Sequence, residues 1–474
     1  MAAISILEFA IRYIDETEAD SPAAAEVSAV NLLYGAGYTL AQNGFNPQTA
    51  TSEDERVIET ITLDVEGTTT DLLASRLATL TDELRNVQRM AADPTSPFGA
   101  WLRRKLKDET NPLQAIIHDM RVDTRQHIFT PATERGNYVI DVVITLTRGP
   151  WEATASMATI TLPNLSSFCG AGNIYSILGD APARVVKALF RSGQPPSPTM
   201  GQLWAGIKAK EDLDLSKFLP VWELELGVMG TDTSVVADGN ASGGNVARCT
   251  FATVSGLSER VAITNAMACG YDTTKYVHQR GNYVVLLRFK GGTSTSYRFR
   301  LDHGSRIPGI VEYITGNLVE QSTDSSSAYY VVNLGVARIP HVERGYMALN
   351  RGQFAFRMMA ERVSGSGNLD MDCLGLIPLP PQNTFGGFFY ACFFSTGDDG
   401  FYFRHYADDA KSVTTRQYSL HADSEMLGGI PPGDSQMVAC MTSETGVSLL
   451  TEHTDVTISA AFARYASRVL RGAA

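Results

Sequence analysis

Acidic residues are the most abundant groups in this sequence that could do chemistry, and two short stretches bring them together. In VSGSGNLDMD (363–372), Asp370 and Asp372 alternate before an apolar run, and two such carboxylates could bind a calcium ion. The stretch lacks the ligand order of an EF-hand, and a turn that leads into a strand explains it equally well. In STGDDG (395–400), the Asp-Gly pair is typical of a hairpin turn. We therefore expect no metal site.

Nucleophiles in this chain lack the neighbours that would activate them. The sequence contains no Gly-x-Ser-x-Gly elbow, no Gly-x-x-x-x-Gly-Lys-Ser/Thr loop and no His-Glu-x-x-His helix. Its eight histidines are scattered, with no pair at the i, i+4 spacing of a zinc-binding helix. Carboxylates are plentiful, but nothing pairs two of them as retaining glycoside hydrolysis requires. We expect no enzyme activity, no catalytic residues and no cofactor.

Aromatic side chains are the remaining candidates for a binding site, because exposed rings stack on sugars. Most of the available rings lie at strand positions, where burial is the ordinary outcome. A structural or docking role is therefore favoured, and glycan binding is the alternative. The candidate rings are Trp204, Trp222, Tyr271, Tyr276, Tyr283, Tyr329 and Tyr330.

Composition excludes several classes of partner. The chain has 474 residues, enough for two to four domains, and its formal net charge is −12. This acidity argues against nucleic acid or an acidic membrane surface as the main partner. No stretch approaches the length of a membrane span, and the first residues do not resemble a secretion signal. We expect a protein without a membrane span, made in a cytoplasm.

Cysteine spacing points to reduced thiols. No Cys-x-x-Cys pair occurs, which makes a zinc site or a small disulfide framework a poor interpretation. We expect buried thiols without a bridge. The six cysteines are Cys169, Cys249, Cys269, Cys373, Cys392 and Cys440.

The first third of the chain combines strands with one strong helix. ERVIETITLDVE (55–66) alternates apolar and polar residues as a half-buried strand does, and Gly67 ends it. An apolar stripe at spacings of three and four then predicts a helix over residues 71–90 that packs on its own sheet, with N-cap candidates at residues 68–71. The stripe consists of Leu73, Leu77, Leu80, Leu84 and Val87.

NYVIDVVITLTRGPWEA (137–153) predicts a long strand that must stop at Gly149-Pro150, because this pair cannot continue a ladder. A strand is also expected at residues 4–10, and a helical stretch at residues 101–108. The first part therefore predicts an α+β unit, with a helix on a small antiparallel sheet. After residue 155, short strands and frequent turns predict all-β sandwiches or jelly rolls, two of them.

The first 155 residues resemble the belt domain of distal tail proteins of tailed phages. The resemblance lies in the strand from Arg56 to Val65 with Gly67, the helix over 71–90, and the strand that ends at Gly149-Pro150 with Trp151. In this family an early strand, a long helix with leucine pairs, and a later strand ending in proline and an aromatic follow in this order. The resemblance implies an α+β belt domain over residues 1–157 that forms a ring.

The remainder resembles the outer domains of enlarged members of that family. GDAPARVVKALFRSG (179–193) and FARYASRVLRG (462–472) look like the beginning and end of a galectin-like sandwich. The sequences between them, such as RGNYVVLLRFKG (280–291) and LDMDCLGLIPLP (369–380), resemble a jelly roll of carbohydrate-binding-module type. The implied domains are 158–220 plus 385–474 for the galectin-like sandwich, and 221–384 for an inserted jelly roll that folds on its own.

The resemblance implies a virion protein of the phage tail, assembled in the host cytoplasm. Its belts would close into a homo-oligomeric ring, a hexamer by the resemblance, that connects the tail tube to the hub or tip proteins of the baseplate. Long strands at Ile4–Ala10 and Val139–Leu146 would supply sheet edges for pairing between neighbours. The alternatives are another virion component, such as a head decoration protein, and a module that binds a host surface glycan.

Overall fold

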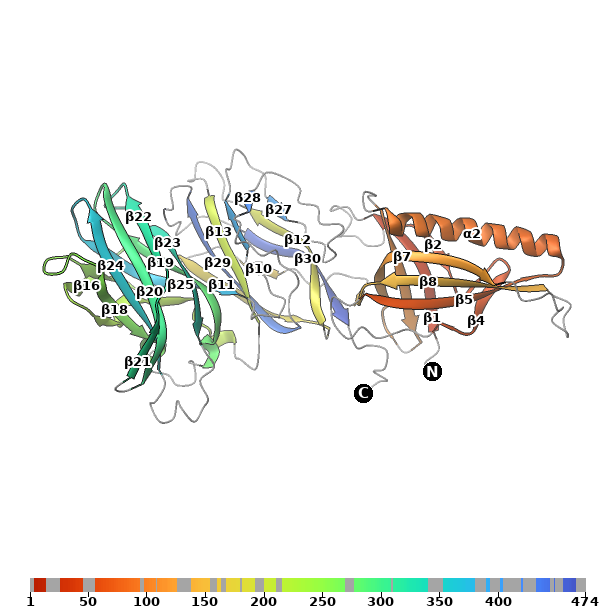
Figure 1. Cartoon of the computed structure of the whole chain (residues 1–474), viewed down its shortest axis with the longest axis horizontal. Helices are drawn as coiled ribbons and strands as arrows, with labels where there is room; N and C mark the ends of the chain where they lie inside the picture. Colours follow the sequence, from red (N-terminus) through yellow and green to blue (C-terminus); the bar gives the residue numbers. More distant parts are fainter. Residues whose placement is uncertain are drawn as a thin grey trace.

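Antiparallel sheets make up most of the structure. The computed structural model describes residues 4–13, 26–45, 56–93, 98–107, 109–125, 138–153, 160–162, 168–179, 181–191, 200–209, 215–268, 277–307, 310–339, 353–379, 389–392, 401–403, 419–420, 432–443, 447 and 455–465. The predicted β-rich character is confirmed, and within the described residues every strand pairing is antiparallel. The molecule is elongated, with strands β1 to β8 at one end and residues 215–379 at the other (Figure 1).

The first unit is a curved sheet of eight strands with one long helix. Along the sheet the strands run in the order β2-β1-β6-β7-β8-β5-β4-β3. Strand β8 ends at Arg148, directly before Gly149-Pro150, as its sequence predicts. The strands are β1 (Ile4–Tyr13), β2 (Glu26–Asn31), β3 (Tyr34–Gly35), β4 (Tyr38–Phe45), β5 (Val57–Gly67), β6 (Phe98–Leu106), β7 (Leu113–Arg125) and β8 (Tyr138–Arg148).

Helix α2 (Thr70–Ala92) forms over the predicted stripe and lies along this sheet (Figure 1). Its N-cap is Thr69, whose side-chain oxygen accepts a hydrogen bond from the Leu72 amide at 3.2 Å. Gly67 lets the helix approach, because a Cβ at this position would lie 2.6 Å from the backbone nitrogen of Leu73. The stripe is buried in one core with side chains of the sheet, among them Phe9 and Ile144.

Two expectations for this unit are wrong. The stretch 101–108, expected to be helical, contains strand β6, which pairs with β1 on one side and β7 on the other. Its short run of apolar residues fits either period, and the two flanking strands decide the outcome. Ile4–Ala10 and Val139–Leu146 are not sheet edges either. Strand β1 pairs with β6 from Ile4 to Tyr13 and with β2 from Glu8 to Arg12, and β8 pairs with β5 and β7, so most of both expected edges is already occupied.

The break at Gly149-Pro150 connects the first unit to the next. The Gly149 amide donates to the carbonyl of Ile116 at 2.9 Å, and the chain then resumes as β9 (Trp151–Ala153). Strand β9 pairs with β7 of the first unit and also with β30 (Asp455–Tyr465) near the other end of the chain. The sheet of the first unit therefore continues into the following unit without interruption.

The middle unit is assembled from two distant parts of the chain. Strands from residues 160–209 pair with strands from residues 389–465, in the orders β27-β12-β30 and β11-β29-β13-β26-β28. Strand β10 adds to β30. The strands are β10 (Ile160–Leu162), β11 (Cys169–Ile177), β12 (Ala181–Arg191), β13 (Met200–Ala209), β26 (Phe389–Cys392), β27 (Phe401–Phe403), β28 (Ser419–Leu420) and β29 (Gly433–Ser443).

The distal unit, residues 215–379, is a sandwich of two six-stranded sheets. Its inner sheet has the order β16-β17-β25-β19-β23 with β14 beside β25, and its outer sheet has the order β15-β18-β24-β20-β21 with β22 beside β20. The strands are β14 (Val221–Glu223), β15 (Val228–Met229), β16 (Thr233–Ala237), β17 (Asn245–Cys249), β18 (Ser258–Thr264), β19 (Gly281–Lys290), β20 (Thr295–Ile307), β21 (Ile310–Ile314), β22 (Leu318–Thr323), β23 (Tyr330–Ile339), β24 (Gln353–Ser364) and β25 (Leu369–Leu379). The short helices are η1 (Leu215–Lys217), η2 (Leu224–Leu226), α3 (Asn265–Ala268) and η3 (Val277–Gln279).

The distal unit shares its core with the middle unit. Phe168, Trp204 and Cys440 of the middle unit belong to the same cluster of buried apolar residues as the distal sandwich. The two backbones also abut, because a Cβ on Gly206 would lie 2.2 Å from the carbonyl oxygen of Pro378. This shared core is an apolar contact that joins the two units, and the independent folding of residues 221–384 stays a prediction.

The buried stripe of α2 gives a direct test of the first unit. Leu80 is 1% exposed, whereas Leu72 on the same helix is 37% exposed. Leu80→Ala removes buried methyl groups and leaves a cavity, so we expect the free energy of unfolding of this unit to fall by about 2–5 kcal/mol. Leu72→Ala, the matched control, should change it by less than about 0.5 kcal/mol. Scanning calorimetry of the full chain measures both, and equal losses would contradict the packing described.

Candidate functional site

The most concentrated group of charged side chains lies on the face of the inner sheet that is turned away from the outer sheet. Strands β19 and β25 are neighbours there, and Lys290 lies opposite Asp370 in their register. The register shifts between Arg288, opposite Cys373, and Phe289, opposite Met371. Asp372 is thus the extra residue of a β-bulge, an irregularity that re-aims a side chain. We call these side chains and the loop 238–244 between β16 and β17 the polar cluster. Its side chains are Glu223, Glu225, Arg248, Arg288, Lys290, Asp370 and Asp372.

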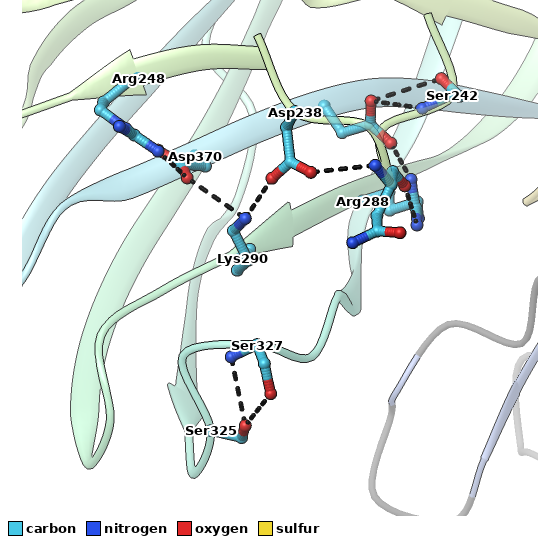
Figure 2. A network of polar contacts seen from close by, with 10 residues as sticks. Asp238, Ser242, Arg248, Arg288, Lys290, Ser325, Ser327 and Asp370 are labelled. Carbon is cyan, nitrogen blue, oxygen red and sulfur yellow. Dashed lines mark hydrogen bonds and ion pairs between the residues drawn. The ribbon is translucent and has the colours of Figure 1, made fainter. Parts of the chain in front are cut away.

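Asp370 and Asp238 each have cationic partners in the polar cluster. Arg248 donates to Asp370 through Nε and Nη2, at 2.7 and 2.8 Å. The Lys290 ammonium donates to Asp238 and lies 3.7 Å from Asp370, so one chain of charges crosses three strands and the loop (Figure 2). Burial would raise the pKa of Asp238, but its bonds to Lys290 and to the Asn240 amide lower the pKa to about 2.

Arg288 and Asp372 form an ion pair in which both side chains are fully buried. Asp372 also accepts a hydrogen bond from the Ser242 amide at 3.0 Å, and Arg288 donates to the Asn240 carbonyl at 3.1 Å. The guanidinium carbon of Arg288 lies 3.8 Å from the centre of the Tyr329 ring, a cation–π contact. The pair thereby fixes the loop 238–244 on the sheet (Figure 2).

Glu223 is a carboxyl of the polar cluster whose pKa is raised towards neutral pH. Its carboxylate accepts a hydrogen bond from the Ser242 hydroxyl at 2.6 Å. Burial raises the pKa of Glu223 to about 7, and the nearby charges of Glu225 and Asp372 add to the rise. Gly243 passes close by, because a Cβ there would lie 2.2 Å from a carboxylate oxygen of Glu225. The carboxyls of Glu223 and Asp372 thus share the guanidinium of Arg288.

A metal ion does not fit this arrangement. Glu223, Asp372 and Cys373 each place one potential ligand atom within 4.8 Å of the others. Asp372, however, already binds the guanidinium of Arg288, and that positive charge repels a second cation. Burial, with the charges of Asp372 and Glu223, raises the pKa of Cys373 well above its usual value, so the thiol keeps its proton and is a poor ligand. The possible calcium stretch is likewise explained, since its Asp370 and Asp372 lie within strand β25 and bind side-chain cations.

Buried thiols in the described residues are poor nucleophiles. Burial raises the pKa of Cys169 to about 12, and it raises the pKa of Cys440 well above its usual value. A thiol that does not ionise at neutral pH does not attack a substrate. In the polar cluster, carboxylates and cations are bonded to one another, and these bonds hold the loop 238–244 on the inner sheet.

The rings considered for stacking on sugars are mostly inside the protein. Trp204, Trp222, Tyr283, Tyr329 and Tyr330 are all buried, which confirms the expectation of burial for these five. Two other candidates, Tyr271 and Tyr276, lie outside the described residues, as does the hairpin candidate 395–400.

Sequence reasoning missed a second polar group, on the outer sheet. Asp302 is fully buried there between Arg300 and Arg357, which donate to it at 2.8 and 2.6 Å. Burial would raise the pKa of Asp302, but the two arginines hold it below its usual value. The guanidinium of Arg357 also lies 4.4 Å from the ring centre of Tyr313. The signal in the sequence, alternating charges in YRFRLD (297–302), identifies a polar face but not its partner strands.

Comparisons with known proteins add little at this point. No protein-family description and no curated protein matches the sequence. The tandem CBM22 module of Xyn10C from Paenibacillus barcinonensis is 10% identical, with 52% of this chain and 96% of that chain covered and a TM-score of 0.22. A tryptic core variant of Cry1Da from Bacillus thuringiensis is 9% identical, with 80% and 52% covered and a TM-score of 0.19. The CBM2 module of an evolved Dit of Lactobacillus casei BL23 phage J-1 is 11% identical, with 50% and 97% covered and a TM-score of 0.11. Scores of this size do not establish a shared fold or function.

The raised pKa of Glu223 leads to a prediction about pH. Between its usual value of 4.5 and about 7, the folded state binds more protons at this position than the unfolded state does. The contribution of Glu223 to stability is therefore fully present below pH 4.5 and is lost as the pH rises through 7. We expect Glu223→Gln to remove this dependence. Urea midpoints of both proteins at pH 5 and pH 8 measure it, and an equal pH dependence in the two would contradict the burial of this carboxyl.

Proposed function

We propose that this protein is a structural component of a tailed-phage virion, a distal tail protein whose N-terminal unit forms a ring between the tail tube and the baseplate or tip. The observation that carries the proposal is strand β9, which belongs to the sheet of the first unit and to that of the middle unit. A joint made of backbone hydrogen bonds transmits force along the elongated molecule, as a connecting part of a tail must. The order of elements in the first unit supports the same conclusion through the resemblance of its sequence to belt domains.

Charged and aromatic side chains reinforce this joint. Trp151 is 1% exposed, and the guanidinium carbons of Arg104 and Arg148 lie 4.8 and 4.3 Å from its ring centre. Arg148 is also paired with Glu59, and both of these side chains are fully buried. Removing one member of such a buried pair costs about 3–5 kcal/mol, so the joint resists distortion. A rigid joint favours a mechanical role over that of a hinged binding module.

The proposed domains assign one task to each unit. Residues 1–157 form the belt, and residues 158–220 plus 385–474 with the inserted 221–384 extend outward as sandwiches that carry other tail proteins. The belt interacts with further copies of itself in a ring of six subunits, by the family resemblance, and with the tail tube and hub or tip proteins. The protein would then be located in the virion tail after assembly in the host cytoplasm. In this role it has no enzyme activity and needs no cofactor.

A ring contact requires surface that a monomer leaves exposed. Because β1 and β8 are flanked on both sides, we place the contact at other positions of the first unit. Tyr34 and Ile58 are its most exposed large apolar side chains, at 67% and 65%. Strand β2 also pairs with β1 alone among the described strands. Unpaired strand edges and exposed apolar side chains are avoided in monomers but are useful between subunits.

Substitution at Ile58 tests the ring. We expect the full wild-type chain to form closed rings at concentrations above the micromolar range, and Ile58→Arg to leave a folded monomer, because a charge then enters an apolar contact. Leu318→Arg is the matched control, since this leucine is 53% exposed but lies in the distal unit, and its rings should persist. Sedimentation velocity and negative-stain images report the assembly. A wild-type chain that stays monomeric, with no ring in the virion, would favour a head decoration protein.

Glycan binding is the second candidate function, and one observation favours it. On the outer sheet, Tyr313 lies beside Arg357, and the side chains of Arg357 and Arg300 are only partly buried. A ring beside fixed hydrogen-bond donors is what a sugar-binding face needs. If this function holds, the chain binds a subset of glycans on an array and Tyr313→Ala reduces that binding at least tenfold, while Tyr34→Ala in the first unit does not. Absence of binding on arrays that include host cell-wall polysaccharide would remove this candidate.

A further inference from the structure

Two cysteines from distant parts of the chain lie directly opposite each other in the middle unit. In the antiparallel pair of β11 and β29, Cys169 is the register partner of Cys440. Residues opposite each other in such a pair have Cα atoms about 4.5–5.5 Å apart, whichever type of pair they form. A disulfide requires Cα atoms about 4.4–6.8 Å apart, so the backbone already provides the separation that a bridge needs.

The side chains of Cys169 and Cys440 also project from the same face of the sheet. Residues directly opposite each other in a sheet project from the same face, and both thiols lie in the core that the middle and distal units share. The neighbouring Cys373 is engaged elsewhere, with its sulfur 3.6 Å from a carboxylate oxygen of Asp372. Cys249 lies on β17 of the distal unit. Among the described cysteines, Cys169 and Cys440 are therefore the pair that the sheet itself brings together.

We propose that Cys169 and Cys440 are a site of oxidative modification, and that they form a cross-strand disulfide when the protein passes from a reducing to an oxidising environment. Neither residue is part of a disulfide in the structure, which is the state expected in a cytoplasm. Strand β11 precedes the distal unit and β29 follows it, so the bond fastens together the two chain segments that the distal unit separates. The proposal does not depend on the function proposed above, since any transfer out of a reducing compartment suffices.

The oxidant is a small-molecule disulfide such as oxidised glutathione. One protein thiolate attacks it, which forms a mixed disulfide and releases one glutathione thiolate. The second protein thiolate then attacks the protein sulfur of the mixed disulfide and releases the second glutathione. In total, two protein thiols lose two electrons and two protons, one disulfide forms in the protein, and the oxidant becomes two thiols.

Burial makes this reaction slow until the sheet opens. The pKa of Cys169 is raised to about 12 and that of Cys440 is raised well above its usual value, in both cases mainly by burial. Little thiolate is present at neutral pH, so exchange requires transient opening of the strand pair and accelerates at higher pH. The pair therefore stays reduced in a reducing compartment and is oxidised slowly after transfer to an oxidising one. Once formed, the bond is protected from reductants by the same burial.

Peptide mapping without reduction tests the proposal directly. The full chain is produced in two bacterial strains, one with a reducing and one with an oxidising cytoplasm, and the reduced protein is also incubated with oxidised glutathione at pH 8. We expect a linked peptide containing Cys169 and Cys440, and a loss of two hydrogen atoms from the intact mass, only under the oxidising conditions. A disulfide between either residue and Cys373 overturns the proposal. So does a protein that stays folded under the oxidising conditions but whose two thiols can still be alkylated after denaturation.

Single substitutions separate the bond from general effects of oxidation. Oxidation should raise the melting temperature of the wild type by about 5 °C, because the bond constrains the unfolded chain. Cys440→Ala should abolish both the linked peptide and the rise, whereas Cys249→Ala should retain both. If Cys440→Ala does not fold, Cys169→Ala supplies the same comparison on the opposite strand. An equal rise in the alanine variants and the wild type shows that another change stabilises the oxidised protein, and the proposal fails.

Discussion

Everything in this molecule depends on one short piece of backbone, strand β9, which hydrogen-bonds to two units at once. Gly149-Pro150 ends the long strand β8, and three residues then pair with β7 on one side and β30 on the other. Because β30 lies near the end of the chain, the first unit is connected both to the strand that follows it and to strands made much later. Trp151, the first residue of β9, is buried at this junction in cation–π contact with Arg104 and Arg148.

The structure also shows where a β-rich protein can accommodate buried charge. Isolated charges are expensive to bury, and Asp238, Asp370 and Asp372 in the polar cluster each lie beside a cationic side chain that donates to them. Replacing a buried ion pair such as Arg288 and Asp372 by apolar residues of similar volume often leaves stability unchanged. The contribution of this pair is therefore to fix the position of the loop that it bonds. Arg288 and Asp372 hold the loop 238–244 in one position, which an apolar contact would do less specifically. The same reasoning applies to Asp302 between its two arginines on the outer sheet.

Sequence reasoning succeeded where a local period decides the structure. The leucine stripe from Leu73 to Val87 and the alternation through β5 and β8 each fix an element and its buried face, because one side of each is strongly apolar. It failed for residues 101–108, where partners far away in the sequence, β1 and β7, determine that the chain is extended. It also failed for the sheet edges, because an edge is defined by the absence of a neighbour and a sequence does not show neighbours. In the candidate site, the residues Asp370 and Asp372 were identified, but their cationic partners come from other strands and could not be.

The divided middle unit imposes an order on how the protein is made. Strands β11 and β13 leave the ribosome before the distal unit, and their partners β26 and β29 leave after it. At about 5–20 residues per second, the interval lasts roughly ten to forty seconds, which is long compared with the folding of most single domains. During this time the four described strands β10, β11, β12 and β13 lack their partners, while the distal sandwich can already collapse beside them. A cell that makes this protein must therefore protect an incomplete sheet during synthesis, and chaperone supply becomes a determinant of its yield.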